Sequence, residues 1–184
     1  MKKLFVSLTT KGSIEKAVKA LEEYKKELTN KGELFCRKLS EIGVQAAQMT
    51  LATKGSGDSS RSASFDVSFV VEGDTVKATL TITSTPHVLK DGRVYYPHLG
   101  WEFGAGIYYN NGNANPLASK AGAKVGVGTF PGQRHAFQEA WYYRDDAGIL
   151  RLSKGTEATM PMYTATIEMM NSIETIAMEV FGGK

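Results

Sequence analysis

The chain has 184 residues, of which 42% are hydrophobic and 22% charged, a composition that excludes intrinsic disorder and allows one folded domain. Its 22 basic and 19 acidic residues give a net charge of +3, too small to mark the whole chain as nucleic-acid-binding. The single cysteine, Cys36, leaves no internal disulfide, and the apolar run at Leu4–Val6 is too short for a signal peptide. No run approaches the ~20 apolar residues of a membrane span, so we expect a soluble protein made in a reducing cytoplasm.

The first expected element is a long amphipathic helix over residues 13–52, with Ser13 as a suitable N-cap and a kink allowed near Asn30–Gly32. Its apolar stripe has a seven-residue interval, joined by residues four places further on: Ile14, Leu21, Leu28, Phe35, Ile42 and Met49, then Val18, Leu39 and Ala46. At ~1.5 Å per residue the helix would be roughly 60 Å long, more than a compact domain of this size needs. Either it lies across a sheet and continues past it, or its overhang packs on a neighbouring subunit.

A serine- and glycine-rich stretch, "KGSGDSSRSAS", predicts a flexible linker after this helix. A hairpin follows, because apolar residues alternate with polar ones on both sides of "EGD": Phe65, Val67 and Phe69, then Val76, Ala78, Leu80 and Ile82. The segment "YYPHLGWEFGAGIYY" continues the period of two, with Trp101, Phe103 and Ile107 on one side and Gly100, Gly104 and Gly106 on the other. We therefore expect an aromatic strand with a nearly bare second face, so that the hairpin and this strand together occupy residues 65–109.

Residues 110–138 are expected to form an extended loop, rich in glycine and asparagine and without helical periodicity. A second hairpin is expected over 139–153, and a C-terminal helix over 159–181, with Thr159 as its cap and Pro161 in its first turn. The apolar stripe of that helix is Tyr163, Ile167, Met170, Ile173, Ile176, Ala177 and Val180. The expected fold class is α+β, an antiparallel sheet of about five strands covered by the two helices, in a single domain 1–184.

Glu102 is the candidate for acid–base chemistry, because Trp101 and Phe103 would desolvate its carboxylate. On a strand it would lie roughly 13 Å from His98, too far for a direct couple, so we expect Glu102 to face solvent or to pair with a basic group of a partner chain. A small enzyme using Glu102 with His98 or His135 is the remote alternative. The three histidines and Cys36 match no metal-ligand spacing, and "GAKVGVGTF" lacks the phosphate-loop pattern, so we expect no metal and no cofactor.

No acidic residue lies between Phe103 and Gln138, whereas Lys120, Lys124 and Arg134 do. This basic segment is either a solvated loop or a surface that docks on a protein or lines a passage for nucleic acid. A nucleic-acid binder working through these three side chains is therefore a further hypothesis. Aromatic residues do not alternate with the basic ones as a base-stacking platform requires.

Three stretches in this order, behind a long N-terminal helix, resemble the tail-component family of long-tailed phages and prophages: "GWEFGAGIYYNN", "VGTFPGQ" and "WYYRDDAGILRLSKGTEATMPMYTA". Glu102, Phe103, Gly104, Ala105 and Gly106 match the family's aromatic-acid-Phe-Gly-(Thr or Ala)-Gly segment. Gly155, Ala158, Pro161 and Met162 match the stretch that leads into its last helix. The resemblance covers residues 13–181, and the added "VLKDGRVYYP" before the aromatic segment departs from shorter members.

The resemblance implies a structural virion protein without catalytic residues, a neck or tail-completion component that forms a ring, expected to be six-fold. The implied partners are its own copies, the neighbouring connector and tail proteins, and DNA that passes through the lumen without sequence-specific binding; no membrane is involved. A tail terminator or head-side stopper of the same connector is the alternative. The residues expected at subunit or partner interfaces are Trp101, Glu102, Phe103, Gly104, Gly106, Tyr108, Lys120, Lys124, Phe130 and Arg134.

Overall fold

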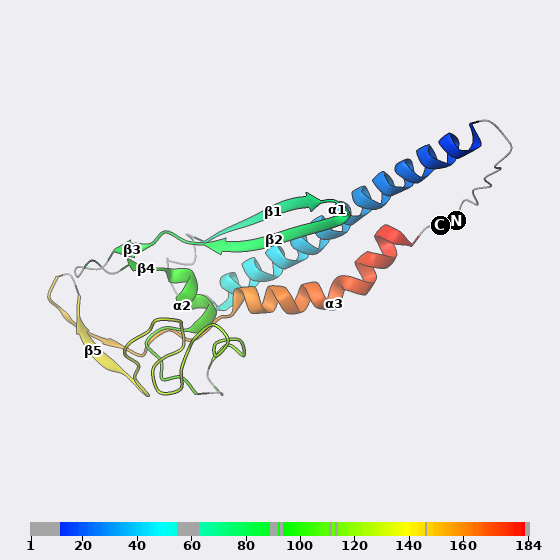
Figure 1. Ribbon diagram of the computed structural model, residues 1–184. Coiled ribbons are helices and arrows are strands. Elements are labelled where there is room, and N and C mark those ends of the chain that lie inside the picture. Colours follow the sequence, from blue (N-terminus) through cyan, green and yellow to red (C-terminus); the bar gives the residue numbers. More distant parts are fainter. Residues whose placement is uncertain are drawn as a thin grey trace.

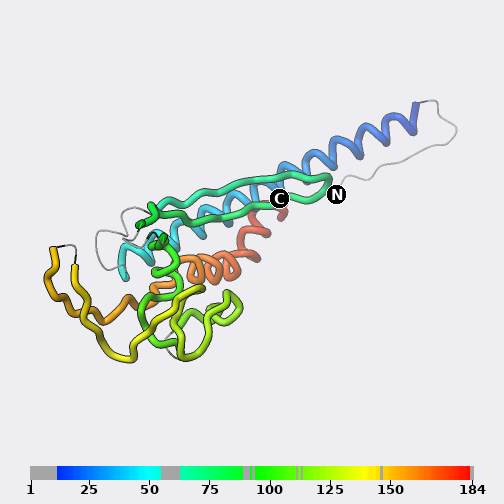
Figure 2. Tube along the Cα trace, turned by 60° about the vertical axis from the view of Figure 1, so that its left-hand side comes forward, coloured from blue at the N-terminus to red at the C-terminus, as the bar shows by residue number. Residues whose placement is uncertain are grey.

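The computed structural model describes residues 12–54, 63–88, 92, 94–110, 112, 114–145 and 147–182. Its elements are, in chain order, α1 (Ser13–Lys54), β1 (Ser64–Glu72), β2 (Thr75–Thr83), β3 (His87–Val88), β4 (Val94–Tyr95), α2 (Pro97–Phe103), β5 (Trp141–Arg144), β6 (Leu150–Ser153) and α3 (Pro161–Phe181). Figure 1 shows α1, α3 and the β1–β2 hairpin side by side in an elongated body, with α2 and β5 at one end. The turned view in Figure 2 shows the same separation. The expectation of a mixed α and β fold is confirmed, whereas most of the predicted linker lies outside the described residues.

The long N-terminal helix is confirmed: α1 has 42 residues and continues through Asn30–Gly32 without a break. At ~1.5 Å per residue it is about 63 Å long. Its buried residues, Ser40, Gly43, Ala47, Thr50 and Leu51, all lie in its C-terminal half. The N-terminal part of α1 is therefore the part that the described residues cover least, and in Figure 1 it extends beyond the end of α3.

The first hairpin is also confirmed, and its register pairs the expected apolar residues, such as Phe65 with Ile82 and Val67 with Leu80. Alternate residues of β1 and β2 are half-buried because one face of the hairpin packs on α1. Two contacts mark this packing. The Arg37 guanidinium lies 4.8 Å from the centre of the Phe69 ring, and the Cys36 thiol lies 3.9 Å from the Val76 carbonyl oxygen.

The expected single sheet of five strands is wrong. The described strands form three separate antiparallel pairs, β1–β2, β3–β4 and β5–β6, and the last of these confirms the second hairpin at 141–144 and 150–153. The reason is that the aromatic strand is absent: Pro97–Phe103 is the helix α2. Among the described residues, no strand therefore joins the two hairpins in a common hydrogen-bonded ladder.

The segment 97–103 is helical because its sequence also satisfies helical spacing. Pro97, Gly100 and Trp101 are three and four residues apart and are the buried residues of α2. Pro97 occupies the first turn, where its missing N–H costs nothing. Gly104 ends the helix with φ +78°, a left-handed conformation, and its N–H donates to the Gly100 carbonyl. Alternating apolar residues over so short a stretch therefore did not distinguish strand from helix.

The segment between α2 and β5 contains no helix or strand among its described residues, as expected for the loop at 110–138. It is nevertheless folded on itself. Tyr109, Ala118 and Ala123 form a small buried cluster, against which Phe103 and Ala114 pack. Backbone bridges join Ile107 to Phe137 and Ala105 to Thr156, so the segment is attached at both of its ends.

The C-terminal helix is confirmed as α3, which runs antiparallel to α1. Met169 approaches Gly43, Glu179 forms an ion pair with Lys38, and the Phe181 ring lies 5.7 Å from the Phe35 ring. Part of the predicted stripe is wrong, because Ile167, Met170 and Ile173 are exposed. The side of α3 turned to α1 instead carries Ala165, Met169, Ile176 and Val180. The helix is apolar on both sides, so its sequence did not reveal which side faces inward.

Gly43 provides a test of this three-way packing of α1, α3 and β2. A Cβ at this position would lie 2.8 Å from the Met169 sulfur and 3.1 Å from Leu80 Cδ2. We predict that Gly43→Val lowers the free energy of unfolding by about 1–3 kcal/mol, because the core must move to accept the side chain. Valine forms helices slightly better than glycine, so a loss reports the clash. Urea unfolding measures it, with Ala52→Val at an exposed position of α1 as control. A Gly43→Val protein as stable as the wild type would contradict the packing.

Candidate functional site

Glu102, in the last turn of α2, holds the start of α3. Its carboxylate accepts hydrogen bonds from the Met162 N–H at 2.8 Å and the Tyr163 N–H at 3.0 Å. It also accepts one from the Asn115 side-chain amide at 2.7 Å. Three segments that are distant in the sequence therefore meet at one carboxylate, and we call this cluster of Glu102, Asn115, Met162 and Tyr163 the Glu102 junction.

The junction satisfies backbone groups that a helix cannot satisfy itself. The first N–H groups of any helix lack an intrahelical acceptor, and an anion there also interacts favourably with the helix dipole. The residue that precedes α3, Met160, has a left-handed φ of 59° and provides no side-chain cap. The acceptor comes instead from Glu102, 60 residues before Met162.

The expected capping role of Thr159 is wrong, because its groups are bound to the Trp101 carbonyl. The Thr159 hydroxyl donates to this oxygen at 3.1 Å and the Thr159 N–H at 2.8 Å. The Met160 N–H donates to the same oxygen at 3.0 Å. The end of α2 therefore binds the chain before α3 through Trp101 and the helix itself through Glu102. Figure 1 shows the two helices meeting there.

Burial raises the pKa of the Glu102 carboxyl above its ordinary value, and the hydrogen bonds from Met162, Tyr163 and Asn115 partly offset that rise. The expectation that Glu102 faces solvent or pairs with a basic group of another chain is therefore wrong: its partners are three N–H groups of its own chain. Each of these partners is an amide that does not titrate, so this geometry is that of a structural cap.

The two histidines proposed to act with Glu102 lie in different surroundings. His98 Nδ1 is 2.8 Å from the Ser84 hydroxyl, and burial lowers the pKa of the imidazole. His135 is exposed, in the segment that follows Gln133. An acid–base role for Glu102 with either histidine stays a prediction. Among the described residues, no cluster of three or more His, Cys, Asp or Glu side chains could hold a metal ion.

Asn115 and Gln133 are buried polar residues that the sequence analysis missed. The side-chain oxygen of Asn115 accepts a hydrogen bond from the Leu117 N–H at 2.8 Å, which closes a turn. The side-chain NH₂ of the same residue donates to Glu102 and so supports the junction. Gln133 accepts the Gly106 N–H at 2.7 Å. The dipeptide Asn115-Pro116 was a turn signal that could have identified the first of them, whereas nothing local marks Gln133.

Two glycines of the "GAG" segment allow close approach of the neighbouring chain. A Cβ at Gly104 would lie 2.8 Å from the Thr129 hydroxyl and 2.9 Å from the Thr156 carbonyl oxygen. A Cβ at Gly106 would collide with the Trp141 ring. Both glycines also have positive φ values, +78° and +72°. They therefore serve packing inside this chain.

The residues predicted to form interfaces fall into two groups. Trp101 and Gly104 are buried within the chain and therefore offer no accessible surface to a partner. Phe103 packs on the cluster around Tyr109. Lys120, Lys124 and Arg134 are exposed. Lys124, Phe130 and Arg134 line one hollow of about 290 Å³, and Lys120 lies outside it. The hydroxyl of Tyr108 is close to Gly126 in the same segment.

Comparisons with protein-family models, with curated proteins and with solved structures found no match to this chain. No helix in the described part of the chain combines the length and the apolar composition that crossing a bilayer requires.

Glu102→Gln tests the junction. Glutamine keeps one oxygen acceptor but places an NH₂ group against the remaining backbone N–H, so the free energy of unfolding at neutral pH should fall by about 1–3 kcal/mol. The pKa of Glu102 is raised, so between its ordinary value of 4.5 and the raised value the folded chain holds a proton that the unfolded chain has lost. The wild-type free energy of unfolding therefore falls as the pH rises through this window, a contribution that the variant lacks.

Urea unfolding of both proteins from about pH 4, just below the ordinary value of 4.5, to about pH 8 measures the difference. The stability gap between wild type and Glu102→Gln should be widest at the acid end. Glu168→Gln, an exposed carboxyl on α3, is the control and should leave stability nearly unchanged. A Glu102→Gln protein as stable as the wild type at every pH would show that the junction does not hold α3.

Proposed function

We propose that the chain is a structural virion protein of a long-tailed phage or prophage, a neck or tail-completion subunit at the joint between head and tail. In this proposal, copies of the chain form a six-fold ring that contacts neighbouring connector and tail proteins. DNA passes through the lumen of the ring without sequence-specific recognition.

The observation that carries the proposal is the uncovered apolar stripe on the N-terminal part of α1. Ile14, Val18, Leu21 and Leu28 lie on one side of the helix and are each 43% exposed or more. Monomeric soluble proteins rarely expose a continuous apolar surface of this length, and such surfaces mark interaction sites. A subunit that is completed by neighbouring subunits accounts for both the length of α1 and its composition.

The two motifs on which the family resemblance rests meet in space, which is a second support. Glu102 in the first motif binds the N–H of Met162 in the second, and Ala105 exchanges backbone hydrogen bonds with Thr156 at 2.8 Å. A shared pattern at two places 50 residues apart is expected when both places build one junction of a common fold. The resemblance is thereby tied to residues that determine how α2 and α3 meet.

The exposed basic segment fits the proposed passage of DNA. The segment between Phe103 and Gln138 contains Lys120, Lys124 and Arg134 but no Asp or Glu. No carboxylate within the segment would therefore repel the phosphates of DNA. A surface that attracts phosphates weakly and without base contacts lets DNA slide. The alternative of an enzyme using Glu102 has less support, because the carboxylate oxygens are occupied by amide donors.

Deletion of the gene from the phage or prophage that carries it tests this function. After induction, negative-stain electron microscopy of the lysate should show filled heads beside separate tails, or heads that have lost their DNA. The titre of infectious particles should fall by several orders of magnitude, because heads and tails cannot join.

A plasmid copy of the wild-type gene should restore joined, infectious particles, which controls for effects of the deletion on neighbouring genes. A plasmid copy with Glu168→Gln should restore them equally well. Intact, infectious particles from the deletion strain would contradict the proposal.

A further inference from the structure

The apolar stripe of α1 has the same pattern of apolar and basic residues in the part that α3 covers and in the part that it leaves exposed. Where α3 covers it, Phe35 contacts Phe181 and Lys38 forms an ion pair with Glu179 at 2.8 Å. One heptad earlier, the same positions are Leu28 and Lys31, and Figure 1 shows α1 extending beyond the end of α3. The uncovered part of α1 therefore repeats a surface that, in this chain, binds an acidic and apolar helix.

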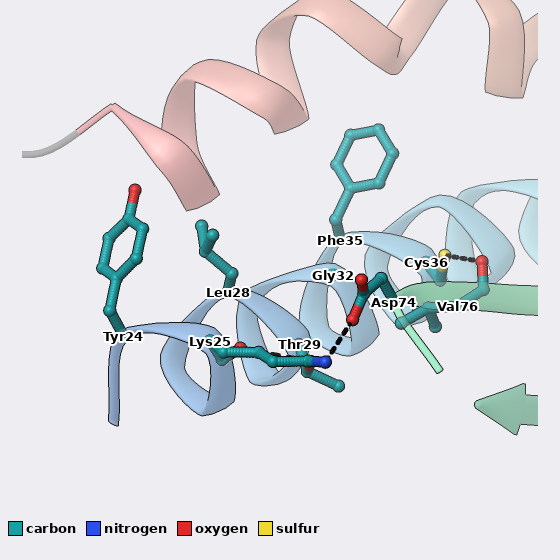
Figure 3. A pocket seen from close by; sticks show the side chains of 9 residues that line it. All are labelled: Tyr24, Lys25, Leu28, Thr29, Gly32, Phe35, Cys36, Asp74 and Val76. Atoms are coloured by element: carbon teal, nitrogen blue, oxygen red, sulfur yellow. Dashed lines mark hydrogen bonds and ion pairs between the residues drawn. The ribbon is translucent and has the colours of Figure 1, made fainter. Parts of the chain in front are cut away.

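The boundary between the two parts is a hollow of about 510 Å³ near the end of α3, drawn in Figure 3. Tyr24, Leu28 and Phe35 line it and point from α1 toward the side on which α3 lies. Lys25 lies away from them and forms an ion pair with Asp74 of the hairpin at 2.8 Å. Beyond this hollow, Leu21, Val18 and Ile14 continue the apolar stripe toward the start of α1.

A second uncovered apolar face lies on α3, on the side away from α1. Ile167, Met170, Ile173 and Met178 are exposed there, Met170 at 61% and Met178 at 68%. Phe181 lies at the edge of this face: it is 42% exposed although its ring contacts Phe35 of α1. Glu174 lies between Met170 and Met178, four residues from each, so it is within this face. We call these residues the outer face of α3.

The two faces match in length and in charge. At ~1.5 Å per residue, the α1 stripe from Ile14 to Leu28 is about 21 Å long and the outer face from Ile167 to Phe181 is also about 21 Å long. Residues 13–31 hold five lysines and four glutamates, whereas α3 holds three glutamates and no lysine or arginine. Contact between the two faces therefore sets a segment with one more lysine than glutamates against Glu174. Lys31, at the position equivalent to Lys38, pairs with Glu27 of its own helix at 3.1 Å and would exchange this exposed pair for Glu174 in the contact.

We propose that the uncovered stripe of α1 in one copy of this chain packs on the outer face of α3 in the next copy. The proposal rests on the ring proposed above and identifies its subunit interface. Contacts of like with like fit less well: two outer faces would bring two Glu174 carboxylates together with no basic residue of α3 between them, and two α1 stripes would leave both outer faces uncovered. Each copy carries one of each face, so the contact is head-to-tail, and repetition of a head-to-tail contact closes a ring when the rotation allows it.

Disulfide trapping between differently labelled copies tests this contact. In a Cys36→Ser background, Leu21→Cys is made on one copy and Met170→Cys on another that carries a size tag. After mild oxidation of the mixture, non-reducing gels should show a dimer that contains one chain of each kind. Neither variant oxidised alone should give a dimer, because the contact joins unlike faces.

A matched pair, Lys19→Cys and Thr175→Cys, places cysteines at exposed positions of the same helices outside the two faces and should give no dimer. Adding Glu174→Lys to the Met170→Cys copy should lower the yield of mixed dimer by roughly threefold to fivefold. Lys31→Glu on the Leu21→Cys copy should restore it.

Dimers from Leu21→Cys alone or from Met170→Cys alone would overturn the proposal in favour of contacts between like faces. Absence of mixed dimers at the highest soluble concentration would overturn it as well. These outcomes are separate from the gene-deletion test. Joined particles from the deletion strain would contradict the role at the head–tail joint but would not contradict a trapped α1–α3 contact. Failure to trap that contact would contradict the subunit interface but would not contradict the deletion result.

Discussion

The hydrogen bonds between the Glu102 carboxylate and the first turn of α3 are the constraint on which the rest of the structure depends. They fix the end of α2 against the start of α3, and Asn115 joins the segment after α2 to the same carboxylate. The Trp101 carbonyl binds the two residues just before α3. Since α3 packs on α1, the position of this junction also sets which part of α1 is covered by α3 and which part α3 leaves exposed.

The molecule divides into an elongated body and a compact end, both visible in Figure 2. The body holds α1, α3 and the first hairpin and presents the two uncovered apolar faces. The compact end holds α2, the second hairpin and the basic segment with Lys124 and Arg134 around one hollow. In a ring, this division would let the helices form contacts between subunits while the basic segment faces DNA, which is how one small chain meets both demands of the proposed function.

The long helix, both hairpins and the last helix could be predicted from the sequence, because their apolar periods extend over enough residues to favour one structure. Residues 97–103 could not, since Pro97, Gly100 and Trp101 satisfy helical spacing while the odd-numbered residues satisfy a strand. The junction was missed for a different reason. Glu102 and Met162 are 60 residues apart, and no local pattern connects a carboxylate to the distant helix that it caps. The aromatic neighbours of Glu102 predicted that its carboxylate would be desolvated, but the identity of its partners depends on tertiary packing.

Amide hydrogen exchange at Met162 and Tyr163, measured by nuclear magnetic resonance, tests the central role of the Glu102 junction most directly. First-turn amides normally exchange quickly because no intrahelical carbonyl accepts them. The structure predicts slow exchange at both amides in the wild type, fast exchange at both in Glu102→Gln, and unchanged exchange in the β1–β2 hairpin of either protein. Fast exchange at Met162 and Tyr163 in the wild type would contradict the junction and the arrangement of helices that depends on it.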